Sequence, residues 1–175
     1  MTLTARTKNF AVSFDGPIAI RYPRGSAHQG LQEYQAPVEY GRSEIIRKGK
    51  KIAVLGVGSM IPSCMEICKG LKDDGYDPTF VNARFVKPLD VDLLDELAKD
   101  HSLFVTVEEN MKSGGYGEHV SAYMEACHPE IRVLSAAVWD RFVPQGNVES
   151  LRSRIGLGVE DIRQAIEDSE ELREQ

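Results

Sequence analysis

The stretch Lys51-Ile-Ala-Val-Leu-Gly-Val57 decides the fold. It is an apolar run that follows the basic turn Lys48-Gly49-Lys50 and shows no polar alternation after Lys51. A strand that is apolar on both faces is typical of the centre of a parallel sheet, because helices cover that sheet on both sides. The stretch therefore predicts a central parallel strand over residues 51–57.

Strands and helices alternate outward from this run. We expect a strand over 43–47 that forms a hairpin with 51–57, and later strands over 79–85, 103–107 and 131–138. Apolar residues three and four apart predict the helices between them, with Ile61, Cys64, Met65, Cys68 and Leu71 in the first, Leu93, Leu94, Leu97 and Ala98 behind the cap Asp90 in the second, Tyr116, His119, Val120, Tyr123, Met124 and Cys127 in the third, and Ile162, Ala165 and Ile166 in the last. Short connections between alternating elements indicate an α/β fold, a three-layer α/β/α sandwich whose mostly parallel sheet has an antiparallel edge strand.

The domain organisation follows from a change in composition. Residues 26–37 are mostly polar and show no periodicity, so we place a linker there. Residues 1–25, with the end of a helix and a strand over 18–22, are interpreted as the C-terminal remnant of a preceding domain. The sandwich itself is expected over 38–168, and residues 169–175 form a charged tail.

Composition and charge exclude several classes of partner. The 175 residues carry a formal charge of −6, and no basic stripe with interleaved aromatic residues is present, which argues against nucleic acid. No apolar run reaches the ~20 residues that cross a bilayer, and the N-terminus lacks the apolar core of a signal peptide, so we expect a cytoplasmic protein without a membrane partner. Three cysteines without a zinc-type cluster predict reduced thiols.

Arginines in the stretch Asp15–Gly25 are the first candidates for binding. Pro23 cannot donate to a sheet and Gly25 frees the backbone to turn, so Arg24 is expected in a loop at the end of a strand. A guanidinium in that place is suited to a phosphate or a carboxylate. From the residues alone, a pair with a neighbouring acid is the favoured role, since most surface arginines have no ligand.

Three further features suggest sites but favour structural roles. Gly56-Val57-Gly58-Ser59 could receive an anion, yet it lacks the third glycine of a dinucleotide fingerprint and the Gly-Lys-Ser/Thr of a phosphate loop, so a tight turn is preferred. Cys64 and Cys68 lie one helical turn apart on an apolar stripe, which favours small core residues over a metal or redox pair. His119 is expected to be a core or boundary histidine.

Acidic residues end the strand predicted over 103–107. Glu108 and Glu109 could cap backbone donors, pair with Arg84 or Lys87, or act in acid–base chemistry, and the structural roles are favoured because no catalytic partner can be named. Arg84 and Lys87 are expected to pair with neighbouring acids or with another domain. No Ser/His/Asp set, metal cluster or complete phosphate loop can be assembled from the sequence.

Five motifs in order carry a family resemblance. They are Gly16-Pro-Ile-Ala-Ile-Arg-Tyr-Pro-Arg-Gly25, Arg84-Phe-Val-Lys-Pro-Leu-Asp90, Val105-Thr-Val-Glu-Glu-Asn110, Gly114-Gly-Tyr-Gly117 and Asp140-Arg-Phe-Val-Pro-Gln-Gly146. From about residue 10 to residue 166 the chain closely resembles the C-terminal part of the 1-deoxy-D-xylulose-5-phosphate synthase family, which ends in a transketolase C-terminal domain. The resemblance identifies residues 1–25 as the remnant of a pyrimidine-binding domain.

The resemblance implies a reaction for the whole enzyme. Pyruvate is decarboxylated on thiamine diphosphate with Mg²⁺, and the two-carbon unit joins glyceraldehyde 3-phosphate to give 1-deoxy-D-xylulose 5-phosphate for isoprenoid and thiamine biosynthesis. It further implies a homodimer, and it matches Arg24 to the family arginine that holds the substrate phosphate; Arg21 matches no assigned role. The cofactor lies between two domains that precede residue 15 in the family.

The resemblance also limits what this chain does alone. It implies no catalytic, cofactor-binding or metal-binding residue within residues 1–175, so the isolated chain is expected to bind neither thiamine diphosphate nor Mg²⁺ and to be inactive. The alternatives are the C-terminal domain of another thiamine diphosphate enzyme, such as a transketolase or a 2-oxo acid dehydrogenase beta chain, a stand-alone regulatory module that binds an anion or nucleotide at Gly56–Ser59, and a structural domain that completes a dimer interface.

Overall fold

The computed structural model describes residues 3–22, 34 and 36–169. The elements, in chain order, are α1 (Leu3–Ser13), β1 (Glu44–Arg47), β2 (Lys51–Gly56), the 3₁₀ turn η1 (Gly58–Met60), α2 (Ile61–Asp73), β3 (Thr79–Asn82), α3 (Val91–Ala98), β4 (His101–Met111), α4 (Tyr116–Cys127), β5 (Arg132–Val138), α5 (Val148–Arg154) and α6 (Val159–Glu167). Strands and helices alternate from β2 to β5, as the sequence predicts.

The sheet is built around β2. Its five strands have the order β1-β3-β2-β4-β5, and β2, β3, β4 and β5 are parallel while β1 runs antiparallel at the edge. Every residue of β2 after Lys51 is buried, which confirms the prediction of a central parallel strand. The α/β class with one antiparallel edge strand is likewise confirmed.

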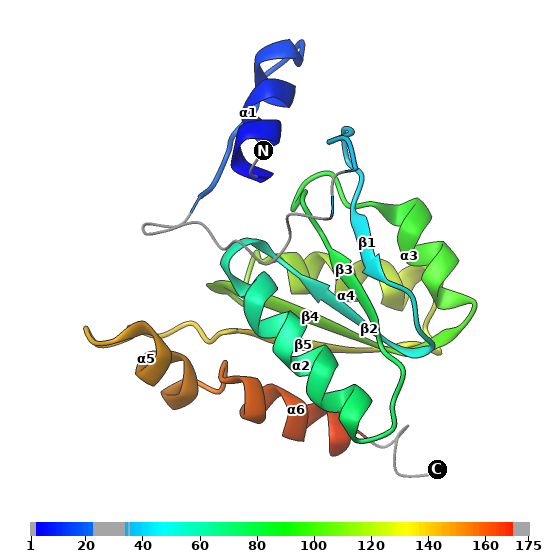
Figure 1. Cartoon of the computed structure of the whole chain (residues 1–175), viewed down its shortest axis with the longest axis vertical. Coiled ribbons are helices and arrows are strands. Elements are labelled where there is room, and N and C mark those ends of the chain that lie inside the picture. Colours follow the sequence, from blue (N-terminus) through cyan, green and yellow to red (C-terminus); the bar gives the residue numbers. More distant parts are fainter. Residues whose placement is uncertain (1–2, 23–33, 35, 170–175) are drawn as a thin grey trace.

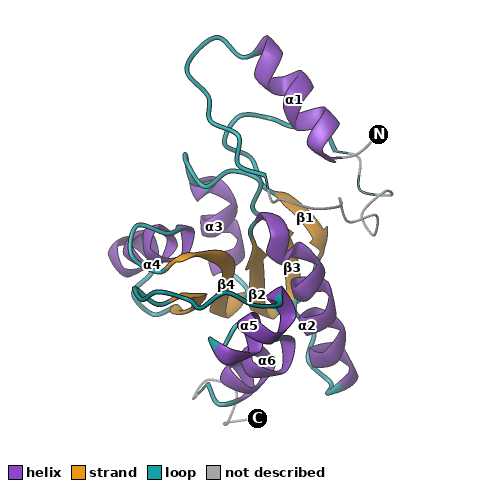
Figure 2. Ribbon diagram, turned by 90° about the vertical axis from the view of Figure 1, so that its left-hand side faces the viewer, coloured by secondary structure: helices purple, strands orange, loops and turns teal. Residues whose placement is uncertain are grey.

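Two helical layers cover the sheet. Residues of α2 and α6, among them Ile61, Ile67 and Ile162, form one apolar core with the strand residues that face them. On the opposite face, α3 and α4 contribute Leu94 and Val120 to a second core. Figures 1 and 2 show the sheet between these layers, with α1 standing apart from them. The architecture is the predicted three-layer sandwich.

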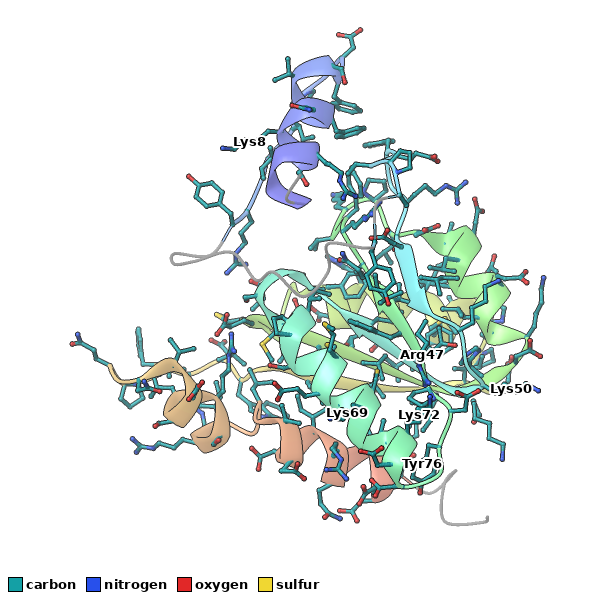
Figure 3. All side chains as sticks on the ribbon, viewed as in Figure 1. Lys8, Arg47, Lys50, Lys69, Lys72 and Tyr76 are labelled. Atoms are coloured by element: carbon teal, nitrogen blue, oxygen red, sulfur yellow. The ribbon has the colours of Figure 1, made fainter. Side chains whose placement is uncertain are left out.

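The predicted hairpin between 43–47 and 51–57 is wrong, because β3 lies between β1 and β2. Lys50 donates its backbone N–H to Asp77 O at 2.6 Å, and Gly49 donates to Thr79 Oγ1 at 2.8 Å, so the connection is tied to the start of β3 instead of folding back on itself. A Cβ on Gly49 would lie 2.0 Å from Asp77 O, which explains the glycine. Figure 3 shows Arg47 and Lys50 at this end of the sheet.

The strand predicted over 18–22 is also wrong. Among the described residues, the extended chain at 17–22 pairs with no strand, and both Ile18 and Ile20 are exposed. An extended segment becomes a strand only when a neighbour satisfies its backbone groups, and the described sheet offers none here. The preceding helix is held by aromatic contacts instead, because Phe10 lies edge-on to Phe85 and Phe14 stacks on Tyr40.

Several strand boundaries and buried helix faces differ from the sequence prediction. β3 ends at Asn82 instead of residue 85, since the backbone turns left-handed at Arg84 (φ 53°). β4 extends over 101–111 instead of 103–107, so the acids after Val107 belong to the strand. His119, Cys127 and Ala165 are exposed, although their spacing placed them on buried stripes. A stripe defined only by spacing is wider than the face that touches the sheet.

Candidate functional site

The carboxyl ends of β2 and β4 meet at the point where the chain changes direction across the sheet. From β2 the chain passes to β3 on one side and then to β4 on the other. Open α/β sheets place their functional groups outside the strands at such a crossover point. The Gly56–Ser59 turn and the adjacent acids Glu108 and Glu109 lie here, so the structure brings together two features that are some fifty residues apart in the sequence.

Glu108 is a cap for the helix that follows it. Its Oε1 accepts the backbone N–H of Gly117 at 2.7 Å, and its Oε2 accepts that of Tyr116 at 3.0 Å. Asn110 Nδ2 donates to the same Oε2 at 3.1 Å. The side chain is fully buried beneath α4, whose first amide groups otherwise have no partner in the helix. Of the roles considered from the sequence, the capping of backbone donors is confirmed.

Glu109 joins two elements on the other face. Ser59 Oγ donates to its Oε2 at 2.6 Å, and Arg152 donates through Nε to its Oε1 at 3.1 Å. Burial raises the pKa of Glu109, but the hydrogen bonds from Arg152 and Ser59, together with the charges of Arg152 and Arg21, outweigh burial and leave the pKa below its ordinary value. An ion pair was one of the roles considered from the sequence, and the partner of Glu109 is Arg152 of α5 and not Arg84, which pairs with Glu44.

The Gly56–Ser59 turn leads directly into η1 and α2. Gly58 adopts a positive φ of 55°, which a glycine tolerates without strain. A Cβ on Gly56 would meet Cys64 Sγ at 2.8 Å, so this glycine lets α2 approach the strand closely. The hydroxyl of Ser59 donates its hydrogen bond to the carboxylate of Glu109, and the negative charge of that carboxylate would repel an anion bound at the turn. These contacts favour the tight turn over an anion site.

Arg84 holds residues 36–37, which lead toward β1. Its Nη2 forms an ion pair with Glu44, and both side chains are almost fully buried. Its Nη1 donates to Pro37 O at 2.8 Å, and its Nη2 to Ala36 O at 3.2 Å. The predicted pairing with a neighbouring acid is confirmed for Arg84. Arg24, the predicted phosphate contact, lies outside the described residues.

The remaining candidates lie apart from this edge. Cys64 and Cys68 are buried in the α2 core, where burial raises the pKa of Cys64 well above its usual range and that of Cys68 to about 12. His119 is exposed on α4. Sequence reasoning missed a small polar cluster in which Asp95 Oδ1 accepts from the hydroxyl of Tyr123 and binds Nε2 of His128, each at 2.8 Å. Asp95 comes from α3, while Tyr123 and His128 come from α4 and the residue that follows it, so no local motif indicates the cluster.

The described residues offer little for a cofactor. In the described ranges, no group of three or more His, Cys, Asp or Glu side chains converges as metal ligands would. The two acids at the crossover point are both engaged, Glu108 by a helix end and Glu109 by Ser59 and Arg152. None of the described helices is long and apolar enough to cross a membrane. Glu108 and Glu109 are therefore not free to hold a metal ion.

Comparison with known proteins gives a consistent result. Residues 41–162 match the family model described as "Transketolase, C-terminal domain". The 1-deoxy-D-xylulose-5-phosphate synthase of Lachnoclostridium phytofermentans is 40% identical over 158 residues, which cover 90% of this chain and 25% of that protein. That of Dictyoglomus thermophilum is 39% identical over 157 residues, 89% of this chain and 25% of that protein. The chain thus spans about a quarter of the length of these curated relatives.

Solved structures show the same fold. A structure described as "Split gene transketolase, inactive beta4 tetramer" has a TM-score of 0.72 and 28% identity, with 78% of this chain and 45% of that chain covered. The transketolase of Campylobacter jejuni subsp. jejuni has a TM-score of 0.50 at 18% identity, with 74% of this chain and 19% of that chain covered, and this likeness concerns the fold alone.

Proposed function

The chain belongs to the transketolase C-terminal domain family, and we propose that it is the C-terminal part of a thiamine diphosphate-dependent transferase of the 1-deoxy-D-xylulose-5-phosphate synthase type. The supporting observation is the 40% identity to such a synthase over 90% of this chain. The complete enzyme would join pyruvate and glyceraldehyde 3-phosphate to form 1-deoxy-D-xylulose 5-phosphate and CO₂, in the cytoplasm and as a homodimer.

The proposal gives the body of this chain a supporting role. Its acids at the crossover point serve as a helix cap and as an ion-pair partner, so the cofactor and Mg²⁺ would be held by the other three quarters of the enzyme's length. When bound there, thiamine diphosphate would stabilise negative charge on the two-carbon unit. Residues 1–25 would be the remnant of the pyrimidine-binding domain, with 26–37 as linker, 38–168 as the family domain and 169–175 as tail.

Arg24 is the one residue of this chain to which we assign a contact with the substrate. It would hold the phosphate of glyceraldehyde 3-phosphate, because a guanidinium fork matches a phosphate in shape and charge. Arg84 fixes the linker that follows this segment to the body. Pulling that linker away would disturb the position of Arg24, so the body's contribution to catalysis would be one of positioning.

The test uses this chain joined in frame to the first three quarters of the Lachnoclostridium phytofermentans synthase, which restores the full length. We expect product formation. In that protein Arg24→Ala raises the KM for glyceraldehyde 3-phosphate by roughly 10- to 100-fold, the loss of one charge-assisted contact, and spares pyruvate decarboxylation. Unchanged kinetics for the phosphorylated substrate would exclude the role of Arg24. Binding of thiamine diphosphate to the 175-residue chain alone, measured by calorimetry, would exclude the division of labour proposed above.

Among the other readings, a transketolase C-terminal domain remains the second candidate, because a split-gene transketolase is 28% identical at a TM-score of 0.72. The joined protein separates the two, since a transketolase would use a ketose phosphate as donor in place of pyruvate. A stand-alone anion-binding module is disfavoured by the carboxylate of Glu109 beside the Gly56–Ser59 turn.

A further inference from the structure

A group of large apolar side chains is exposed just beyond the carboxyl end of β5. Residues 139–148, here called the aromatic loop, include Trp139, Phe142, Val143 and Val148, with exposed fractions of 58%, 104%, 37% and 54%. Phe142 therefore contacts almost nothing within the described chain. Single exposed apolar residues are ordinary in globular proteins, but four within ten residues, two of them aromatic, are typical of a protein interface.

Contacts near both ends hold the aromatic loop in place. Lys112, directly after β4, lies 4.6 Å from the ring centre of Trp139. At the other end of the loop, Asn147 caps α5 through its Oδ1, which accepts from Glu149 N at 3.0 Å. Arg152 then ties α5 to Glu109 in β4. A surface that is both apolar and fixed at its two ends loses little conformational entropy when a partner covers it.

A second exposed apolar segment borders the same edge. Ile18, Ile20 and Tyr22 are exposed at alternate positions of the extended segment 17–22. The charge of Arg21 lowers the pKa of Glu109, the same side chain that Arg152 binds. Figure 1 shows the segment that follows α1 and the helix α5 on the side of the sheet where β2 and β4 end. The two apolar groups therefore flank one edge of the body.

The length of the related enzymes indicates what covers this edge. The related synthases are about four times as long as the match, so about three quarters of such an enzyme lies outside this chain. The linker joins the body at the same end of the sheet, where Arg84 at the end of β3 binds Ala36 and Pro37. A second copy of this chain is the alternative occupant, and the experiment below tests for it.

We propose that the aromatic loop is a docking surface for the polypeptide that carries the cofactor-binding three quarters of the enzyme, with Trp139 and Phe142 as its central contacts. The proposal rests on the proposed function, since it takes the partner from the same family of enzymes. Aromatic side chains of this kind commonly supply most of the binding free energy of an interface. Their burial would also exclude water from the ion pair between Glu109 and Arg152, which holds α5 to the sheet.

The single tryptophan provides a direct probe. We would label this chain with 5-fluorotryptophan, so that its one fluorine resonance reports on Trp139. The probe partner is the first three quarters of the Lachnoclostridium phytofermentans synthase, made as a separate chain whose folding is verified by circular dichroism. We expect the resonance to shift on mixing, and Phe142→Ser to weaken binding by more than about tenfold.

Val91→Ser is the matched control, because Val91 is an exposed apolar residue of α3, outside the aromatic loop. It should bind as the wild-type chain does, and the Phe142→Ser chain should keep the wild-type melting temperature because the side chain is fully exposed. Equal binding by Phe142→Ser and wild type would overturn the proposal. So would the absence of binding by the wild-type chain, or self-association of the chain that Phe142→Ser abolishes, which would make a second copy the occupant.

The outcomes separate this proposal from the proposed function. Binding through the aromatic loop without product formation would leave the docking surface in place and reject the enzymatic assignment. If the joined protein forms product equally well with and without Phe142→Ser, the enzymatic assignment would stand and the docking surface would be rejected.

Discussion

The buried carboxylate of Glu108 accepts the backbone N–H of Gly117 at 2.7 Å, across nine residues of sequence. The contact joins the carboxyl end of β4 to the first turn of α4. It gives this acid the role of a helix cap, one of the structural roles that the sequence favoured over catalysis. The same contact makes a clear prediction about stability.

Glu108→Gln should lower the free energy of unfolding by about 1–3 kcal/mol, because an amide has one acceptor oxygen where the carboxylate offers two to the amides of Tyr116 and Gly117. Urea unfolding followed by circular dichroism measures the change. Glu130→Gln, at an exposed position, is the control and should leave the midpoint unchanged. A variant at Glu108 as stable as the control would show that the cap contributes nothing.

Gly117→Ala should also destabilise the fold. The new Cβ would lie 2.2 Å from Ser135 Oγ and 2.4 Å from Thr106 Oγ1, so α4 would have to move away from the sheet. Overpacking of this kind typically costs about 1–3 kcal/mol. Gly146→Ala serves as the control, since its Cβ would meet only Leu151, at 3.4 Å or more. Equal thermal midpoints for the two variants would contradict the close approach of α4.

The ion pair of Glu109 should make the free energy of unfolding depend on pH in the acid range. Its pKa in the folded protein lies below the ordinary 4.5, so the stabilisation is complete above 4.5 and is lost as the pH falls through the folded value. Unfolding at a series of pH values should therefore show a steeper acid loss for the wild type than for Glu109→Gln. Parallel curves would mean that Ser59 and Arg152 do not favour the ionised form. Arg152→Ala should move the wild-type curve toward that of Glu109→Gln.

The three thiols should differ sharply in reactivity. Cys64 and Cys68 are buried, and burial raises the pKa of each, whereas Cys127 is exposed. Because the thiolate is the reactive form, the native chain should react rapidly with a disulfide reagent at one thiol, and Cys127→Ser should remove that reaction. Denaturant should release the other two thiols. Rapid labelling of the native Cys127→Ser chain would place Cys64 or Cys68 at the surface.

Arg84→Ala should loosen the linker as well as the body. The substitution leaves Glu44 buried without its partner, which typically costs about 3–5 kcal/mol, and it removes the donors to Ala36 and Pro37. Limited proteolysis should then cut the chain ahead of β1 faster than in the wild type. Lys99→Ala, which breaks an exposed ion pair with Glu96, should change neither the rate of proteolysis nor the stability appreciably. Equal proteolysis of the two variants would argue against Arg84 as an anchor.

Prediction from the sequence succeeded where one element carries its own pattern. The apolar run at 51–57, the stripe of α2 and the cap Asp90, which accepts from Leu93 N at 3.3 Å, needed no knowledge of neighbours. It failed where two elements had to be paired. The short basic turn between β1 and β2 suggested a hairpin. In the structure β3, which begins thirty residues after Gly49, lies between these two strands and pairs with both.

The candidate site divides in the same way. Glu108 and Glu109 stand out in the sequence as acids at the end of a strand, but their partners are distant, with Arg152 43 residues after Glu109. No spacing rule connects residues on separate elements, because their contact depends on how helices pack on the sheet. Glu44 was missed for the same reason, and Arg24 stays a prediction.

What the sequence alone determined is the class of fold and the family, because hydrophobic periodicity and the ordered motifs are properties of the chain itself. What only the tertiary structure decided is how each charged group is used: Glu108 for a helix end, Glu109 for Ser59 and Arg152, Arg84 for the linker. The physical reason is that a buried charge must find a partner wherever packing brings one, and packing joins residues without regard to their distance along the chain.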